Sequence, residues 1–245
     1  MEENQVKKLA TVLLTAAMLL SLAACGVSKK ITPETTEQPR QNETAAPAEG
    51  SQSDAGVPET AKTPAGRILI AYFTLPETDG VDAVASASRV VTDSGVIGNT
   101  EFIAREIQKN LGGDLFAIET VQSYPGSHAP LLDFAYNEKA AQARPELSTH
   151  IENLDGYDYV FVGYPNWNAD LPMPMYTFFE EYDFSGKTIV PFVTHGGSGF
   201  SNTIRTIQKL EPDAVVVESG LSVSRSRVAD AQADVKAWTD SLLAG

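Results

Sequence analysis

The sequence ILIAYF, residues 68–73, is a short and nearly continuous run of apolar, β-forming residues. Such a run is typical of a strand that is buried on both faces, as the strands of a parallel sheet are. Four further segments also predict strands, although Pro191 within the third of them disfavours a central strand. These segments are Leu115–Val121, Tyr157–Gly163, Thr188–Thr194 and Ala214–Val217.

Helical patterns lie between these strands and after the last of them, at Thr100–Leu111, Pro130–Ala143, Pro174–Glu181, Asn202–Leu210 and Val228–Leu243. This alternation of strands and helices predicts an α/β domain whose parallel sheet is covered on both faces. Because crossover connections are right-handed, we expect a five-stranded, doubly wound sheet with strand order 2-1-3-4-5. Ligands bind such sheets beyond the carboxyl ends of the strands, so the loops after the first, third and fourth strands are candidate binding loops.

The first of these loops ends with Gly98-Asn99-Thr100, directly before a predicted helix. The free amides and the positive dipole end at a helix N-terminus can hold a phosphate group without a lysine. However, Gly-Asn is also a common turn and Thr a common helix cap. Taken alone, these three residues therefore favour a structural role.

The other two loops each carry one conspicuous feature. In Tyr164–Asn168, Trp167 could stack on a flat aromatic ligand, or it could fold back onto the core. In His195–Gly199, three glycines can bring backbone amides close to a ligand, and the alternative is a mobile connector.

The N-terminal residues have the pattern of a targeting signal. Lys7 and Lys8 precede the apolar run Leu9–Leu22, which is shorter than the roughly 20 residues that span a bilayer and fits a signal peptide. The run ends in Leu-Ala-Ala-Cys25, which resembles a bacterial lipobox. We therefore expect a signal peptide at residues 1–24 and a lipid anchor on Cys25. A plain secretory signal with an incidental cysteine, or a buried helix, is the alternative.

Residues 26–65 are rich in Thr, Glu, Gln, Pro, Ala, Ser and Gly. Such a segment buries too little apolar surface to offset the entropy of ordering it. The sequence therefore predicts a lipidated cysteine and disordered tether at residues 25–65, followed by one domain at residues 66–245.

The overall composition excludes several classes of function. The chain has a formal net charge of −14, and from residue 66 onward twelve Lys and Arg stand against twenty-four Asp and Glu. An acidic domain repels phosphate backbones, so no nucleic-acid partner is expected. One cysteine allows no intrachain disulfide, and three scattered histidines do not indicate a metal centre.

From Arg67 to Trp238 the chain resembles the flavodoxins, in particular a bacterial subgroup of flavodoxin-like proteins. The resemblance rests on six strings that follow one another in the same order: ILIAYFT, GNTEFIA, GYPNW, DLPMPMYTF, YDFSGKTIVPF and THGGSG. It implies a flavodoxin-like fold that binds FMN non-covalently. No catalytic residue is expected, because the flavin itself performs the electron chemistry.

The resemblance also implies a role for each binding loop. The FMN phosphate would be held by Thr74, Gly98, Asn99 and Thr100. One face of the isoalloxazine would be covered by Pro165, Asn166, Trp167 and Asn168, with Trp167 as the stacking group. Another edge of the ring would be lined by His195, Gly196, Gly197, Ser198 and Gly199.

The sequence departs from the family pattern at two places. Leu75–Ile97 intervenes between the first strand and the phosphate loop, and we expect an excursion such as a short hairpin near the rim of the cofactor. This insertion puts the role of Thr74 in question. In addition, Asn168 stands where many relatives carry a second tryptophan, so the ring is expected to be less enclosed.

The sequence thus predicts electron transfer on the extracytoplasmic side of the cell envelope, with a redox partner that it does not identify. The acidic domain should disfavour a negatively charged reduced flavin, which predicts a low potential. One alternative is an FMN-dependent reductase of quinones or small electrophiles, with His128, Arg144 and Tyr124 as candidate contacts above the ring, although a role on the surface or in helix packing is favoured for all three. Another is a binding module that has lost the cofactor. A hydrolase is disfavoured because the chain has no Gly-x-Ser-x-Gly motif.

Overall fold

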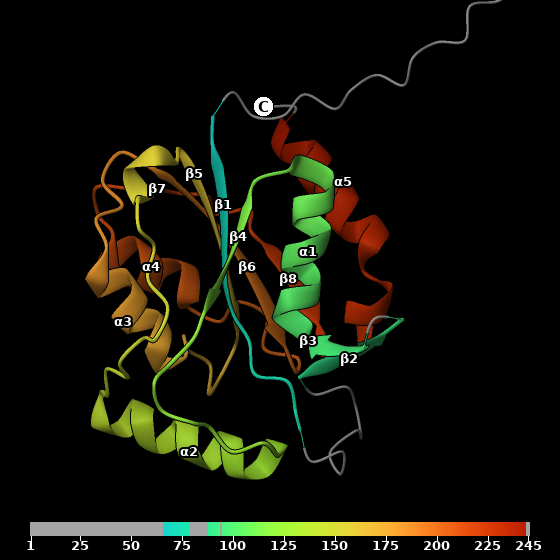
Figure 1. Cartoon of the computed structure of the whole chain (residues 1–245), viewed down its shortest axis with the longest axis vertical. Coiled ribbons are helices and arrows are strands. Elements are labelled where there is room, and N and C mark those ends of the chain that lie inside the picture. Colours follow the sequence, from blue (N-terminus) through green and yellow to red (C-terminus); the bar gives the residue numbers. More distant parts are fainter. Residues whose placement is uncertain (1–65, 79–87, 94, 244–245) are drawn as a thin grey trace, which may run out of the picture. The chain divides into compact units, whose positions relative to one another are not determined.

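The apolar run at residues 68–73 forms an inner strand of a parallel sheet (Figure 1). The computed structural model describes residues 66–78, 88–93 and 95–243. The strand order is β4-β1-β5-β6-β7, and β8 also pairs with β6. The predicted α/β fold and strand order are confirmed. The strands are β1 (Ile68–Phe73), β4 (Asp114–Ile118), β5 (Tyr159–Pro165), β6 (Thr188–His195), β7 (Val215–Val216) and β8 (Leu221–Ser224).

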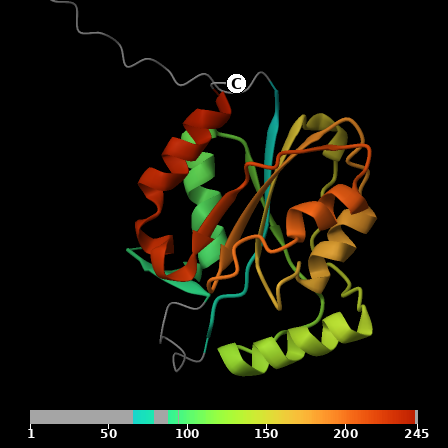
Figure 2. The same cartoon turned by 180° about the vertical axis from the view of Figure 1, so that it is seen from behind.

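The alternating side chains of β1 explain why its sequence is apolar throughout. Leu69, Ala71 and Phe73 pack in one hydrophobic cluster, together with residues of α3 (Met173–Glu181) and α4 (Thr203–Leu210). Ile68, Ile70 and Tyr72 pack in a second cluster, with residues of α1 (Asn99–Leu111) and α5 (Gln232–Leu243). Figures 1 and 2 show these helix pairs on opposite faces of the sheet. Both faces of β1 are therefore buried, as its sequence predicts.

The fifth position of the sheet is divided between two short strands. β7 pairs with Thr188 and Ile189, whereas β8 pairs with the stretch from Phe192 to His195. Pro191 lies between these two pairings, and its carbonyl oxygen is 2.5 Å from where a Cβ on Gly220 would be. Because the N–H and C=O of one strand residue face the same side, the amide that proline lacks falls in this gap. The predicted strand Ala214–Val217 covers only β7, so β8 is missed by the sequence pattern.

The helices agree with the predicted segments except near the C-terminus. The predicted helix Val228–Leu243 begins as a 3-10 helix, Arg225–Asp230, and only then continues as α5. α2 (His128–Ala141) lies across the end of the sheet to which the carboxyl ends of the strands point (Figure 1).

The segment between β1 and α1 contains the expected hairpin. β2 (Arg89–Thr92) and β3 (Gly95–Gly98) pair in antiparallel fashion, and β3 runs directly into α1. The hairpin lies beside the first turn of α1, at the same end of the sheet as α2 (Figure 1).

The predicted signal peptide, Cys25 and the tether lie outside the described residues. Within the part of the chain that the structure describes, no helix is both long enough and apolar enough to span a bilayer.

We predict that Gly163→Ala destabilises the fold, because a Cβ at this position of β5 would collide with the ring of Phe192 on β6. Overpacking of a core typically lowers the free energy of unfolding by about 1–3 kcal/mol. Urea denaturation followed by circular dichroism measures the loss. Adding Phe192→Leu should recover part of the lost stability, and the single Phe192→Leu variant completes the cycle. A Gly163→Ala protein as stable as the wild type would contradict this packing.

Candidate functional site

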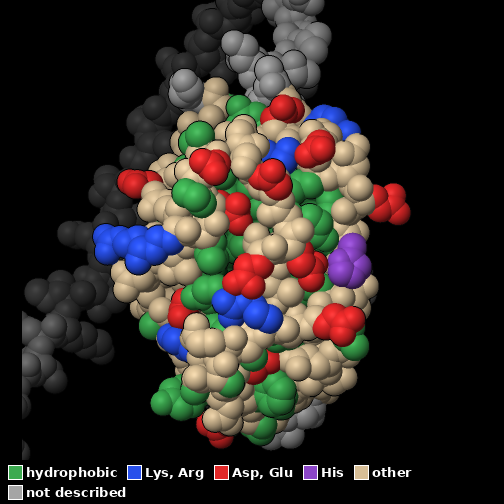
Figure 3. Space-filling model, turned by 90° about the vertical axis from the view of Figure 1, so that its left-hand side faces the viewer, with side chains coloured by type: hydrophobic (Ala, Val, Ile, Leu, Met, Phe, Trp, Pro, Cys, Tyr) green, Lys and Arg blue, Asp and Glu red, His purple; other side chains and the backbone are tan. Residues whose placement is uncertain are grey.

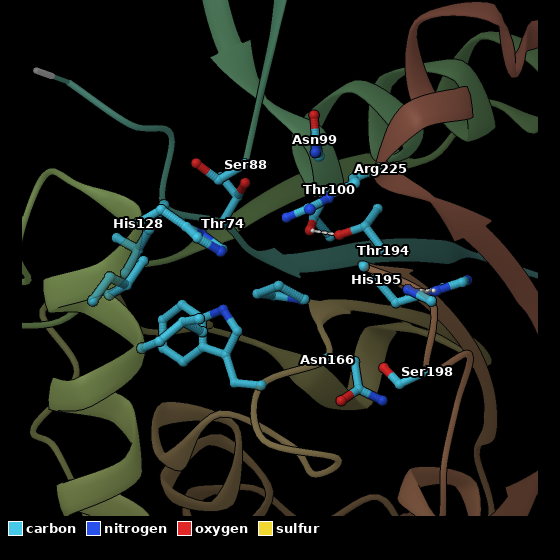
Figure 4. Close-up of a pocket in the computed structure, with 17 residues that line it drawn as sticks. Thr74, Ser88, Asn99, Thr100, His128, Asn166, Thr194, His195, Ser198 and Arg225 are labelled. Atoms are coloured by element: carbon cyan, nitrogen blue, oxygen red, sulfur yellow. Dashed lines mark hydrogen bonds between the residues drawn. The ribbon is translucent and has the colours of Figure 1, made fainter. Parts of the chain in front are cut away.

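A cavity of about 340 Å³ lies at the carboxyl ends of β1, β5 and β6 (Figure 4). Its size is within the range of about 300–1,000 Å³ that is usual for small-molecule sites. Most of the predicted site residues line it: Thr74, Asn99, Thr100, Pro165, Asn166, Trp167, His195, Gly196, Gly197 and Ser198. Three predicted residues, Gly98, Asn168 and Gly199, do not. The lining residues that the sequence did not single out for binding the cofactor are Leu75, Ser88, His128, Leu131, Leu132, Thr194 and Arg225.

Gly98 does not face the cavity because it packs against Thr74. A Cβ on Gly98 would collide with the Oγ1 of Thr74. The end of β3 therefore lies against the residue that directly follows β1. Thr74 consequently lies at the start of α1 and lines the cavity, although the insertion had put its role in question.

At the first turn of α1, two hydroxyls tie the helix to β6. The Oγ1 atoms of Thr100 and Thr194 are 2.9 Å apart and buried. The backbone amide of Asn99 donates to the carbonyl of Ser88 at 2.9 Å, so this amide is not free to bind a ligand. The first turn of α1 therefore offers one free backbone amide fewer for a phosphate than the sequence suggests. Hydroxyl groups make up much of the wall at this end, as Figure 4 shows for Thr74, Ser88, Thr100 and Thr194.

Trp167 combines the two roles that the sequence left open. Its side chain is only 8% exposed. Its ring meets that of Phe73 edge-on at 5.5 Å and that of Tyr124 at a tilt, 5.8 Å away. Trp167 also lines the cavity, beside Leu131 of α2. The indole is thus held in the core and still contributes to the wall, which makes it a rigid apolar surface.

Asn166 lines the cavity, and its side-chain oxygen is a buried acceptor. Its Nδ2 donates to the carbonyl of Gly199 at 2.8 Å and to the Oγ of Ser201 at 3.1 Å. These two bonds fix the amide plane, and they explain why Gly199 supports the site without lining it. The Oδ1 of Asn166 is buried and has no hydrogen-bond partner within the described residues. A buried acceptor of this kind costs free energy unless a ligand or water donates to it.

The loop after β6 is held by its own histidine. The amide of Gly197 donates to the Nδ1 of His195 at 2.9 Å, and Gly197 has a φ of +136°, which favours glycine. Burial lowers the pKa of His195 below its ordinary value. Both observations favour the neutral imidazole, because a protonated Nδ1 cannot accept the hydrogen bond.

Several candidate residues have other partners. Asn168 is exposed, and its carbonyl accepts a hydrogen bond from Lys139 at 2.9 Å. Arg144 pairs with Glu180 at 2.7 Å, and Tyr124 donates to Glu138 at 2.9 Å. Of the three candidate substrate contacts, only His128 lines the cavity.

The charge of the cavity differs from that of the domain. Among the described residues that line the cavity, Arg225 is the only one with a permanent charge, and none is a carboxylate. By contrast, acidic side chains are spread over the outer surface on the left-hand side of Figure 1, which Figure 3 shows face-on. The cavity is therefore suited to an anion, within a domain whose net charge is strongly negative.

Solved structures resemble this chain along most of its domain. A protein from Bacteroides eggerthii, described as a "putative flavoprotein", is 26% identical, with a TM-score of 0.50 and coverage of 74% of this chain and 99% of its own. A similarly described protein from Bacteroides uniformis is 24% identical (TM-score 0.47; 67% and 96% covered). A flavoprotein in complex with FMN from Lactobacillus acidophilus is 16% identical (TM-score 0.48; 69% and 99% covered). The last two are too distant to support an inference.

No curated protein sequence is significantly similar to this chain. A family model, in contrast, matches residues 88–242, which is more than half of the chain and nearly the whole described domain. That model describes flavodoxins. The strand order, the cavity at the carboxyl ends of the strands and this match agree, and the chain belongs to the flavodoxin family.

Proposed function

We propose that this protein binds FMN non-covalently in the cavity described above and transfers electrons at the cell envelope. Membership of the flavodoxin family supports FMN as the cofactor. The observation that carries the proposal is the cavity itself: a helix N-terminus and hydroxyl groups lie at one end, and the apolar surface of Trp167 and the polar side chain of Asn166 lie elsewhere on its wall. A phosphate ester joined to a flat, hydrogen-bonding ring system matches this distribution.

The phosphate would be bound where α1 begins. The positive end of the helix dipole favours an anion there. The hydroxyl of Thr74 and one of the two paired hydroxyls of Thr100 and Thr194 are placed to donate to phosphate oxygens, and no carboxylate that would repel the phosphate is found among the described lining residues.

The ring would lie between the loops that follow β5 and β6. Trp167, already fixed by its contacts with Phe73 and Tyr124, offers an aromatic surface at no further cost in side-chain entropy. Asn166, whose amide is fixed by its bonds to Gly199 and Ser201, would border the ring beside Trp167. When bound, FMN supplies the electron chemistry, and these residues bind and orient it.

The envelope location rests on the N-terminal sequence. A lipid on Cys25 would anchor the chain, and residues 26–65 would let the domain reach a redox partner away from the membrane surface. The low potential expected from the acidic domain would make the protein an electron donor rather than an acceptor.

One observation favours a second function, an FMN-dependent reductase of quinones or small electrophiles. His128 lines the cavity, and its Nδ1 is 3.9 Å from Oε1 of the buried Glu77. An imidazole next to a carboxylate can donate a proton to a substrate that is reduced by two electrons. Turnover of a quinone with a reduced nicotinamide as the sole donor would favour the reductase, whereas its absence would favour the carrier.

We predict that the purified full-length chain quenches the fluorescence of FMN on titration, because the ring stacks against an indole. Asn166→Ala should weaken FMN binding about three- to tenfold, because it removes a wall residue whose bonds to Gly199 and Ser201 hold the two ring loops together. Asn168→Gly is the matched control: the residue is adjacent, exposed and absent from the cavity wall, and its φ of +52° suits glycine. Its dissociation constant should stay within about twofold of the wild type. Failure of the wild-type chain to quench FMN would refute the proposed cofactor.

We predict that the contribution of His195 to the stability of the domain falls as the pH drops below about 6.5. The pKa of His195 is lowered in the folded state, so the unfolded chain takes up the proton first, and acidification favours unfolding. Urea denaturation of the cofactor-free protein at pH 7.5, 6.5 and 5.5 measures this. His195→Asn retains an acceptor but does not titrate, so its stability should fall less steeply than that of the wild type. Equal slopes for the two proteins would show that His195 does not contribute.

We predict that Cys25→Ser releases the protein from the membrane, since a serine hydroxyl cannot form the thioether to lipid. Detergent phase partitioning of the expressed protein is the measurement. The wild type should enter the detergent phase and the variant the aqueous phase. A wild-type protein found in the aqueous phase would exclude the lipid anchor and leave the cofactor site unaffected.

A further inference from the structure

Arg225 reaches the cavity from a part of the chain that the binding motifs do not include. It is the first residue of the 3-10 helix Arg225–Asp230 and directly follows β8. Ser224 of β8 pairs with His195 at the end of β6. The Nε, Cζ and Nη1 atoms of Arg225 are all 3.8 Å from where a Cβ on Gly196 would be. The plane of the guanidinium therefore lies over Gly196, at the carboxyl end of β6.

The charge of Arg225 has no counterion within the described part of the chain. The other arginine of the same 3-10 helix, Arg227, lies 3.8 Å from the carboxylate of Asp234, and Arg144 is paired with Glu180 at 2.7 Å. No such ion pair involves Arg225 among the described residues. In a domain with twice as many acidic as basic residues, a half-buried arginine that has no carboxylate partner among the described residues and lines a cavity is suited to bind an anion from solution.

The guanidinium and the N-terminus of α1 border the same end of the cavity. Thr194 precedes His195 on β6, and its hydroxyl lies 2.9 Å from that of Thr100 in the first turn of α1. Figure 4 shows Arg225 close to Thr100 and Thr194, on the opposite side of the cavity from His128. Two independent sources of positive potential, a helix dipole and a formal charge, thus act on one group of the ligand.

We infer that Arg225 is a specificity-determining residue, which binds the dianionic phosphate of the cofactor and makes the site select the phosphorylated flavin over the uncharged riboflavin. This inference rests on the proposed function. A guanidinium forms charge-assisted hydrogen bonds with a phosphate and gains nothing comparable from a hydroxyl group. The ring contacts at Trp167 and Asn166 are the same for both flavins, so they do not discriminate between them.

The experiment compares the dissociation constants of FMN and riboflavin, measured by fluorescence quenching with the full-length chain. Arg225→Gln should weaken FMN binding about tenfold, which corresponds to about 1.4 kcal/mol, and change riboflavin binding less than twofold. Arg227→Gln is the matched control, because it removes the same charge from the same helix but does not line the cavity. It should leave both constants within about twofold. Arg225→Lys keeps the charge and should retain part of the preference for FMN.

Ionic strength gives a second readout that does not depend on a loss of folding. Raising the salt from about 0.02 to 0.5 M should weaken FMN binding to the wild type more than to Arg225→Gln, because salt screens the charge pair. Thermal unfolding of the cofactor-free variants shows whether each one is folded.

The possible outcomes distinguish a failure of this inference from a failure of the proposed function. Equal loss of FMN and riboflavin binding in a folded Arg225→Gln protein would overturn the inference, because Arg225 would then support the ring or the loop rather than the phosphate. Unchanged FMN binding in that variant would overturn it as well, while the cofactor assignment would stand. A wild-type chain that binds neither flavin would instead overturn the proposed function and, with it, this inference.

Discussion

The geometry of the site depends on the close approach of Gly98 to Thr74. Only a residue without a Cβ lets the end of β3 reach the residue that follows β1, and this contact sets where α1 begins. The hydroxyl pair of Thr100 and Thr194 then joins the first turn of α1 to the end of β6. Two strands and one helix are thereby fixed to each other at one point, and the cavity opens beside it.

Much of the fold was predictable because its signals are local and periodic. The run at residues 68–73 is apolar at every position, since its alternate side chains enter two separate clusters. β8 was missed because it is only four residues long and contains two serines, so its pattern does not differ from that of a loop. The start of α5 was misplaced because Val228 is buried like a helical core residue, although it lies in a 3-10 turn.

The site residues that lie in recognisable motifs were predictable from the sequence, whereas most of the others were not. The three loops that follow β1, β5 and β6 supply most of the lining, and strand order alone brings them together. Arg225 comes from a segment with no motif, and only the tertiary structure places it at the cavity, whereas His128 was one of three candidate contacts and the only one of them that lines it. The hydrogen bond from the amide of Asn99 to Ser88 was equally unforeseeable, because it depends on how the inserted hairpin returns. The twofold role of Trp167 could not be resolved from sequence, since being packed in the core and lining a cavity do not exclude each other.

The division of the fifth strand position has a consequence for how the protein meets other copies of itself. A long outer strand offers a row of free backbone groups on which another chain can add a strand, and this is a common route to aggregation. Here that border of the sheet consists of a two-residue and a four-residue strand, separated where Pro191 has no amide to donate. Neither piece is long enough to act as a template. The same interruption that leads the chain to Arg225 therefore also protects this edge of the sheet from adding a strand.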